Sequence, residues 1–422
     1  MASFQFELAR PEDDKQLRNL LARNVMSGEI SLSFRREPAY FAACQLDGSE
    51  SQTIVCRELA SNRIVGLGSR SVRDRYVDGQ VERIGYLSTL RLDQEHRRRG
   101  LVARGFRFFK GLDEDIKEPF FRAKYYVTTI ADGNAAAEQT LLGGRAGLPH
   151  YHRIGTWSTY SLSMRRCRSS PIPGVEVRPA RESEIGLVVG YLNTIGAERN
   201  LFPKYRIEDF DPQTGTFRGL NRSHLFVAWE KGDIVGTFAL WDQSAFKQVV
   251  VEGYAPWLRC CRPIYNAWAF WKRDPKLPKP GKVLEHLVGT LLVVRNDRSD
   301  VANLLVSKAC DAYSKANGRL KTTSVMQPLS GLSGRLSLRE SDFALPPGGS
   351  SEARAGYDSF CGSPKTPNRL LLGFDARCPL STKFAASASH VYTTGIYLVS
   401  WDPMQWKEYN RDRLIYLELG CL

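Results

Sequence analysis

Three consecutive arginines followed by a glycine, Arg97 to Gly100, are the residues of this chain best suited to hold an anion. They follow residues 84–92, whose apolar side chains alternate as in a β-strand, and they precede a segment with helical apolar spacing. A helix N-terminus presents unpaired N–H groups and the positive end of the helix dipole. Glycine lets the backbone approach a ligand, and arginine adds charge and donors. The sequence therefore predicts a phosphate or pyrophosphate site.

This segment resembles the acyl-CoA signature of the GNAT acyltransferase superfamily, which is Arg/Gln-x-x-Gly-x-Gly/Ala after a central strand. Arg97 and Gly100 match the pattern at the right spacing, whereas Val102 stands where glycine or alanine is usual. Residues 96–102 also resemble the Arg-Arg-x-Gly-Leu-Leu version in the aminoglycoside-acetylating "enhanced intracellular survival" proteins. The alternative interpretation is a basic, solvated helix start that holds no ligand.

The resemblance implies acetyl-CoA, or another acyl-CoA, as co-substrate and assigns residues to it. The main chain of Leu90, Arg91 and Leu92 would align the pantetheine arm. The pyrophosphate would be held by Arg97, Arg98, Arg99, Gly100, Leu101, Val102 and Ala103. The family's next element is an Asn-x-x-Ala helix, and it is present at Asn134. Asn134 would contact the pantetheine, or it would only cap a helix.

Acyl transfer from a thioester to an amine requires deprotonation of the amine and accommodation of the leaving thiolate. The family's usual general acid is a tyrosine, and this chain has Leu141 in its place. Tyr151 is the best replacement, with an ordinary half-buried aromatic as the alternative. Glu82, just ahead of the central strand, is the predicted general base, with an exposed hairpin charge as the alternative. Tyr86 and Ser88 would line the substrate groove or pack within the sheet.

The chain contains two copies of one pattern. Residues 6–14 and 175–182 both read as a strand, an Arg-Pro turn and a helix start, and residues 62–66 and 232–236 both read as a hairpin turn entering a strand. Because both pairs of similar segments are separated by nearly the same number of residues, they indicate a duplicated unit. The predicted fold is α/β (mixed α+β), with two tandem GNAT-like domains, each a central mixed, splayed β-sheet flanked by helices.

The predicted domains are residues 1–165, which would bind acyl-CoA, and residues 175–422, a degenerate copy. Residues 166–174, polar and Pro-containing, form the predicted linker. No glycine follows the second central strand, residues 287–294, until well into the next helix, so the phosphate cradle is expected to be lost there. Insertions are expected at about 241–284 and 329–369. The first is rich in tryptophan, and it would wall the acceptor site or form a dimer surface.

Composition excludes several classes of protein. The chain has 422 residues, 42% apolar and 25% charged, as in a soluble globular protein. A net charge of +14 favours acidic partners, but no aromatic-and-basic nucleic-acid module is recognisable. No signal peptide or membrane span is visible. Nine dispersed cysteines without a CxxC favour a reducing cytoplasm and no bound metal.

Together these features predict an acetyl-CoA-dependent N-acyltransferase that acts on an amine of a small molecule or protein. The alternative is a non-catalytic, regulatory protein that binds acyl-CoA, which Leu141 and the missing second cradle favour. The expected partners are acyl-CoA and an amine acceptor, without membrane or nucleic acid, and a homodimer is left open.

Overall fold

The computed structural model describes residues 3–44, 46–47, 50–114, 123–144, 147–272, 274–323, 367–402, 404 and 409–419. The first half of the chain contains, in order, β1 (Phe4–Leu8), α1 (Asp14–Arg23), β2 (Ile30–Arg35), α2 (Tyr40–Cys44), β3 (Glu50–Glu58), β4 (Arg63–Val77), β5 (Gln80–Leu92), α3 (Leu101–Glu114), β6 (Tyr126–Ala131), α4 (Ala135–Leu141) and β7 (His150–Ser163). The second half contains β8 (Val175–Pro179), α5 (Ile185–Gly196), β9 (Phe202–Pro203), β10 (Leu225–Glu230), β11 (Asp233–Trp241), β12 (Gln248–Tyr254), α6 (Pro256–Lys272), β13 (Lys282–Val283), β14 (Leu287–Val294), α7 (Ser299–Thr323), β15 (Arg369–Asp375), α9 (Pro379–Ala385) and β16 (Ala388–Ser400).

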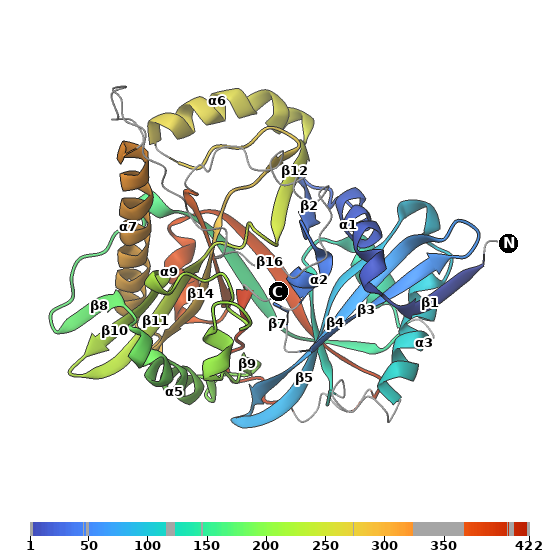
Figure 1. Ribbon diagram of the computed structural model, residues 1–422, viewed down its shortest axis with the longest axis horizontal. Coiled ribbons are helices and arrows are strands. Elements are labelled where there is room, and N and C mark those ends of the chain that lie inside the picture. The colour runs from blue at the N-terminus through green and yellow to red at the C-terminus, as the bar shows by residue number, and fades with distance from the viewer. Residues whose placement is uncertain are drawn as a thin grey trace, which may run out of the picture.

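One mixed sheet runs through both halves (Figure 1). Its strand order is β1-β3-β4-β5-β6-β16-β7-β15-β14-β11-β10-β8, and β9 pairs with β4 beside this path. The strand–helix starts β1-α1 and β8-α5 correspond to the first pair of similar segments in the sequence, so the tandem repeat is present in the fold. The predicted fold class, a mixed α/β architecture with helices flanking a central sheet, is confirmed.

The two halves exchange their last strands. β16 lies between β6 and β7, and it pairs antiparallel with both. β7 lies between β16 and β15, so it leaves the first half and pairs with the second from Trp157 to Ser163. Each half of the sheet is therefore completed by a strand from the other half of the chain.

Helices cover both faces of this sheet because successive side chains of a strand point to opposite faces. In the first half, Val55 packs under α1 and α2, while its neighbour Cys56 packs under α3. In the second half, Val227 packs with α5, while Phe226 packs with α7. β14 (LVGTLLVV) is buried along its whole length, which explains its continuous apolar sequence.

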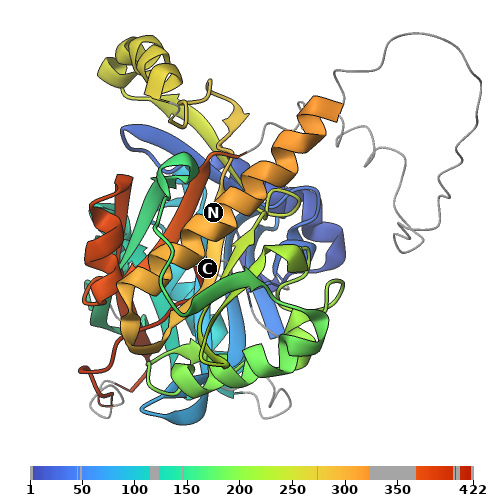
Figure 2. The same cartoon turned by 90° about the vertical axis from the view of Figure 1, so that its left-hand side faces the viewer.

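A smaller sheet, in the order β13-β12-β2, joins the halves through the pairing of β12 with β2. α6 follows β12, and Figure 2 shows this helix standing clear of the main body. β12, α6 and β13 occupy the first predicted insertion. The second one, 329–369, lies outside the described residues except for its last three, and the domain boundaries stay a prediction. No helix in the described part of the chain is long and apolar enough to cross a bilayer.

Candidate functional site

β5 and β6 are parallel neighbours that diverge. Their ladder consists of Gly85 opposite Tyr126 and Tyr86 opposite Val127. A Cβ on Gly85 would lie 2.1 Å from Tyr126 Cδ1, so the strands meet at a point where only glycine fits. β6 then continues with β16, and β5 continues with β4 to Leu92. Beyond the meeting point, no strand among the described residues pairs with this edge of β5, and this gap in the pairing is called the opening here. An extended ligand could pair with the main chain of β5 along such an edge.

Two threonines of β6 bridge the narrow end of this opening. Thr128 Oγ1 donates to the carbonyl of Leu87 at 2.8 Å, and Thr129 Oγ1 lies 3.0 Å from the hydroxyl of Tyr86. Burial raises the pKa of Tyr86 to about 12, so its phenol is neutral at physiological pH. The side chains of residues 88–92 are half-buried or exposed, so the wider end remains open to solvent.

A bulge in β5 lies at the opening. The register with β4 shifts between Leu67 and Ser69, and Thr89 has a φ of +53°. A β-branched residue in the left-handed region costs roughly 1–3 kcal/mol and persists only where its surroundings impose it. Such bulges occur next to active sites, because they redirect main-chain groups that would otherwise pair within the sheet.

Buried hydroxyls hold Thr89 in this conformation. Its Oγ1 donates to Ser69 Oγ at 2.8 Å, and Ser69 Oγ also lies 2.9 Å from the hydroxyl of Tyr40 and 3.0 Å from Thr53 Oγ1. Burial raises the pKa of Tyr40 to about 12, which keeps its proton available for this network. The network connects the bulge to α2 and to the adjacent strands β3 and β4.

The turn between β5 and α3 has the features of an anion site. Arg98 has a φ of +62° and Gly100 a φ of +69°. Left-handed residues in a turn gather successive N–H groups into a concave surface that attracts anions. α3 starts at Leu101, and apart from Gly100 and its two chain neighbours, no atom of the described residues lies within 4 Å of the place where a Cβ on Gly100 would be. The space in front of the helix N-terminus is therefore open to a ligand.

The three arginines of this turn are exposed. Arg97 Nε donates to the carbonyl of Leu92 at 3.4 Å. For the side chains of Arg98 and Arg99, the described residues supply no hydrogen bond or ion pair. Their guanidinium groups are therefore available to a phosphate.

The other predicted cofactor residues have mixed environments. Leu90 is 40% exposed, and Arg91 is half-buried with its Nη1 donating to the carbonyl of Leu90 at 2.9 Å. Burial lowers the pKa of Arg91. Leu101 is buried, and Leu92 packs against the same cluster. Val102 packs against the core between α3 and the sheet, which explains why a larger residue than alanine fits there, and Ala103 beside it is half-buried.

Asn134 caps α4, since its side chain accepts a hydrogen bond from the N–H of Ala137 at 3.2 Å. The capping interpretation is therefore correct, and a contact between Asn134 and a cofactor stays a prediction.

Glu82 lies away from the bulge. Glu82 is seven residues before Thr89 on the same strand, roughly 20 Å at the usual rise per residue. Its Oε1 accepts from Lys124 Nζ at 3.0 Å. Tyr151 is half-buried in β7, its pKa raised by burial, in the same core cluster as Leu141. Their predicted roles as base and acid stay predictions.

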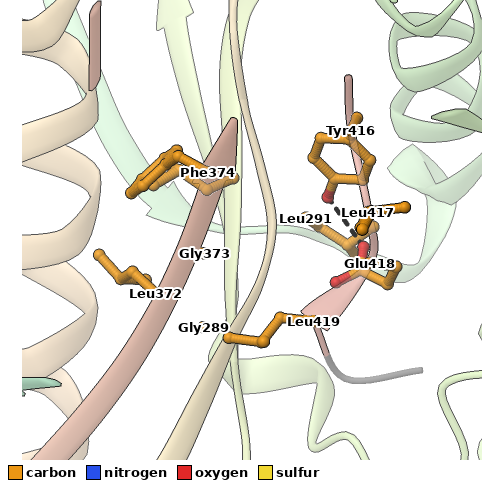
Figure 3. A pocket seen from close by; sticks show the side chains of 10 residues that line it. Gly289, Leu291, Leu372, Gly373, Phe374, Tyr416, Leu417, Glu418 and Leu419 are labelled. Carbon is orange, nitrogen blue, oxygen red and sulfur yellow. Dashed lines mark hydrogen bonds between the residues drawn. The ribbon is translucent and has the colours of Figure 1, made fainter. Parts of the chain in front are cut away.

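The second half repeats the geometry of the first. β14 and β15 pair in parallel at Leu287–Leu370 and Val288–Leu371, and the φ of Leu291 is +56°. The groove between these strands is lined in part by residues 416–419 of the chain's own C-terminal segment (Figure 3). Glu418, 2% exposed, accepts from the hydroxyls of Tyr416 at 2.8 Å and Tyr205 at 2.9 Å. The chain's own C-terminal segment therefore forms part of the wall of the second groove.

The turn before α7 carries acidic residues in place of the glycine and free arginines. Arg298 pairs with Glu230 at 2.9 Å and Asp300 at 3.0 Å, and Asp297 pairs with Arg199. Carboxylates at a helix N-terminus satisfy its positive end and repel a phosphate. These ion pairs support the expectation that the phosphate cradle is lost in the second half, which stays a prediction.

A possible metal-ligand group lies close to the anion site. Asp93, Glu95 and His96 offer ligand atoms within 4.8 Å of one another. Arg23 Nε and Nη2 donate to the two oxygens of Asp93 at 2.7 and 2.8 Å, and Arg63 also pairs with this carboxylate at 3.2 Å. Asp93 is therefore already neutralised by protein, and the expected absence of metal stays a prediction.

Sequence reasoning missed the bulge at Thr89, its support by Tyr40 and Ser69, and the closure of the second groove by residues 416–419. No local signal marks Thr89, because threonine favours extended backbone with negative φ. The one available signal was the pair of neighbouring hydroxyl residues, Ser88 and Thr89, and such pairs are also common in ordinary strands.

Comparison with known proteins supports the fold. No protein-family model matches the sequence, and no curated protein matches it. The chain is similar to N-myristoyltransferase from Saccharomyces cerevisiae with bound myristoyl-CoA (TM-score 0.51, 10% identity, covering 99% of this chain and 86% of that one). A second structure of that enzyme, with myristoyl-CoA and inhibitors, has a TM-score of 0.51 at 11% identity and covers 95% of this chain and 80% of the other.

A GCN5-related N-acetyltransferase from Anabaena variabilis has a TM-score of 0.49 at 8% identity, covering 97% of this chain and 75% of that one. At these identities, similarity concerns the fold and leaves the activity open. The N-myristoyltransferase structures match nearly the whole chain, across both halves. The chain therefore has a fold similar to that of N-myristoyltransferase.

Proposed function

We propose that the chain transfers an acyl group from acyl-CoA to an amine and that its first half binds the acyl-CoA. The observation that carries the proposal is that the open edge of β5, the bulge at Thr89 and the basic turn at Gly100 lie in series along one strand and the turn that follows it. The pyrophosphate would lie at the turn. The pantetheine would extend along the edge of β5, and the thioester would lie at the bulge.

In this arrangement the backbone does most of the chemistry. The neutral amine attacks the thioester carbon, and the carbonyl oxygen becomes an oxyanion. A main-chain N–H turned outward by the bulge would donate a hydrogen bond to that oxygen. In other acyl-transfer enzymes, removal of one such donor lowers kcat by about 10²–10³-fold. The C–S bond then breaks, CoA leaves as a thiolate, and the amide forms. The proton of the amine leaves with a base or with water.

The groups nearest the bulge that could assist are Tyr86 and Ser88. Ser88 Oγ is buried and has no hydrogen-bond partner among the described residues, and it adjoins Thr89 in the strand. Tyr86 is a neutral phenol at the narrow end of the opening. Glu82, which lies on the other side of the parallel ladder from the bulge, receives less support from its position.

The test is calorimetric titration of the full chain with acetyl-CoA and with longer acyl-CoAs, together with thiol release in the presence of amines. We expect one site per chain. Arg97→Ala and Arg99→Ala should each weaken binding by roughly 5- to 150-fold if the guanidinium holds a phosphate. Arg298→Ala, the same change at the turn of the second half, is the matched control and should leave binding unchanged. Equal losses in all three variants, or in none, would remove the assignment.

A second candidate function is acyl-CoA binding without turnover. The observation that favours it is Leu141, buried in the core where the family's acid tyrosine would be. This candidate predicts the same single site and the same losses in the arginine variants. It differs in predicting no thiol release above the rate of spontaneous hydrolysis, whichever amine is supplied.

A further inference from the structure

α6 carries a stripe of exposed apolar side chains. The stripe residues occur at intervals of three, one, three, four and three, which places them on one side of a helix. They are Trp257, Cys260, Cys261, Ile264, Trp268 and Trp271. Ile264 is 74% exposed and Trp271 84% exposed, and the other four are exposed as well. Monomeric proteins rarely expose this much contiguous aromatic surface unless something binds to it.

The opposite face of α6 is fixed to the protein. Asn266 exchanges two hydrogen bonds with the main chain of Leu277, at 2.9 and 2.8 Å. Arg262 Nη1 donates to the carbonyl of Pro278 at 3.0 Å, and Ala269 is completely buried. Asn266, Arg262 and Ala269 thus face the protein, which places the apolar stripe on the outer side.

The helix also stands apart from the candidate acyl-CoA site. It is carried by β12 and β13 of the small sheet, and Figure 2 shows it at the tip of this projection. Asp274, which follows the helix, pairs with Arg166 at 2.5 Å and fixes the projection to the segment between the halves. The stripe therefore faces away from the protein body and can meet a broad, flat surface.

The surroundings of the stripe are strongly basic. Residues 256–282 contain seven lysines and arginines and a single acidic residue, Asp274, which is already paired. Lys272, Lys276, Lys279 and Lys282 are exposed. An apolar aromatic stripe beside a concentration of lysines is the pattern of helices that lie in the interface of a membrane.

We propose that α6 docks the protein onto the surface of a bilayer that contains anionic lipid. The tryptophans would enter the boundary between headgroups and acyl chains, where tryptophan is enriched, and the lysines would lie among anionic headgroups. The helix lies on the bilayer and does not cross it. This proposal departs from the expectation from sequence, which was that the protein has no membrane partner, and it does not depend on the proposed enzymatic activity.

The positive charge around the stripe favours a lipid bilayer, and not a second copy of the chain, as the partner that covers it. A two-fold symmetric dimer would place the same patch of each copy against itself. The exposed Lys272, Lys276, Lys279 and Lys282 of each copy would then be brought close to those of the other, and like-charge juxtaposition opposes such an interface. An anionic bilayer supplies the complementary charge.

The experiment uses the full chain and vesicles of phosphatidylcholine, with and without phosphatidylserine as a minority lipid. Co-flotation measures binding, and quenching of tryptophan fluorescence by brominated lipid reports insertion. We expect binding to the phosphatidylserine vesicles that weakens as salt is raised. Replacing Trp257, Trp268 and Trp271 together by serine should reduce binding by at least roughly ten-fold. All three are exposed, so the variant should keep the native unfolding temperature.

A matched control is Leu187→Ser with Ile207→Ser, which removes side chains 58% and 59% exposed elsewhere on the surface. This control should bind vesicles like the native chain. Lys272, Lys276, Lys279 and Lys282 replaced by glutamine should abolish the preference for phosphatidylserine. Absent vesicle binding, or equal binding by the tryptophan variant, would overturn the proposal. So would light scattering that shows a native dimer, a monomeric tryptophan variant and no lipid binding, because a second copy would then cover the stripe.

Discussion

Thr89 and Leu291 occupy the same place in the two halves of the molecule, 202 positions apart. Each is the positive-φ residue of a bulge in a central strand, and each follows a short parallel ladder by the same interval. Their surroundings differ. Thr89 is half-buried beside an opening, whereas Leu291 is fully buried beside residues 416–419. The duplicated backbone thus repeats the bulge in both halves, and the chain's own C-terminal segment lies beside the bulge of the second half.

Removing the hydroxyl of Thr89 tests whether the bulge is held from behind. Thr89→Val keeps the shape of the side chain and the unfavourable φ but loses the hydrogen bond to Ser69. We expect the free energy of unfolding to fall by about 1 kcal/mol, the typical net value of such a bond. If the bulge N–H stabilises the oxyanion, kcat should fall more than KM rises. Denaturant unfolding and steady-state thiol release measure the two effects. A variant as stable and as active as the native chain would show that the hydroxyl network is dispensable.

The central strands and the helix after Gly100 could be predicted from sequence because their signals are local. The alternating pattern of residues 84–92 became the greater part of β5, and the continuous apolar run became β14 with the predicted bounds Leu287–Val294. α3 begins at Leu101, directly after the arginines and the glycine. The cap at Asn134 also follows from residue type and position alone.

The remaining features depend on residues far apart in the sequence. β7 and β16 pair across more than two hundred residues, and an alternating pattern does not name its partner strand. The bulge at Thr89 opposes the local preference of threonine and depends on Tyr40, in another element. Glu418 closes the second groove through Tyr205, again remote in sequence. Such contacts decide which residues surround each of the two bulges.

Gly100 should be needed for cofactor binding beyond its contribution to stability. Gly100→Ala places a side chain at a φ of +69°, which costs about 1–2 kcal/mol, and it fills the open space before α3. Gly174→Ala is the matched control, since that glycine also has a positive φ, +77°, and open space around it. We expect similar losses of stability in both variants but weaker acyl-CoA binding in Gly100→Ala alone. Calorimetry measures the affinity of each variant for acyl-CoA, and thermal unfolding measures its stability. Equal affinities in the two variants would mean that the pyrophosphate binds elsewhere.

Glu184 should make the second half sensitive to acid. Arg178 donates to both of its carboxylate oxygens, at 2.8 and 2.7 Å, and with the N–H of Arg181 this lowers the pKa of Glu184 to about 2. In the unfolded chain the pKa of glutamate is about 4.3. A lowered folded-state pKa adds stability that is complete above the unfolded value and is lost as pH falls from about 4 to about 2.

Glu184→Gln should therefore unfold more easily than the native chain at neutral pH, and the difference should shrink below pH about 4. Denaturant midpoints measured across this range provide the test. Asp211→Asn is a suitable control, because the pKa of Asp211 is lowered by hydrogen bonds within its own turn, first of all from the N–H of Thr214. If the difference in stability between Glu184→Gln and the native chain stays constant with pH, the ion pair with Arg178 does not cause the loss of stability in acid.

Glu82 provides the sharpest test of where the chemistry occurs. A general base in direct contact with the amine typically contributes about 10²–10⁴ in rate, so Glu82→Gln would lower turnover by at least that much if Glu82 had this role. Glu82 instead pairs with Lys124, and Gly85 and the parallel ladder lie between it and the bulge. We therefore expect turnover within roughly three-fold of native and an unchanged pH–rate profile. Ser88→Ala, beside the bulge, is the comparison that should reduce turnover more. A hundred-fold loss in Glu82→Gln alone would move the acceptor amine to the paired end of β5.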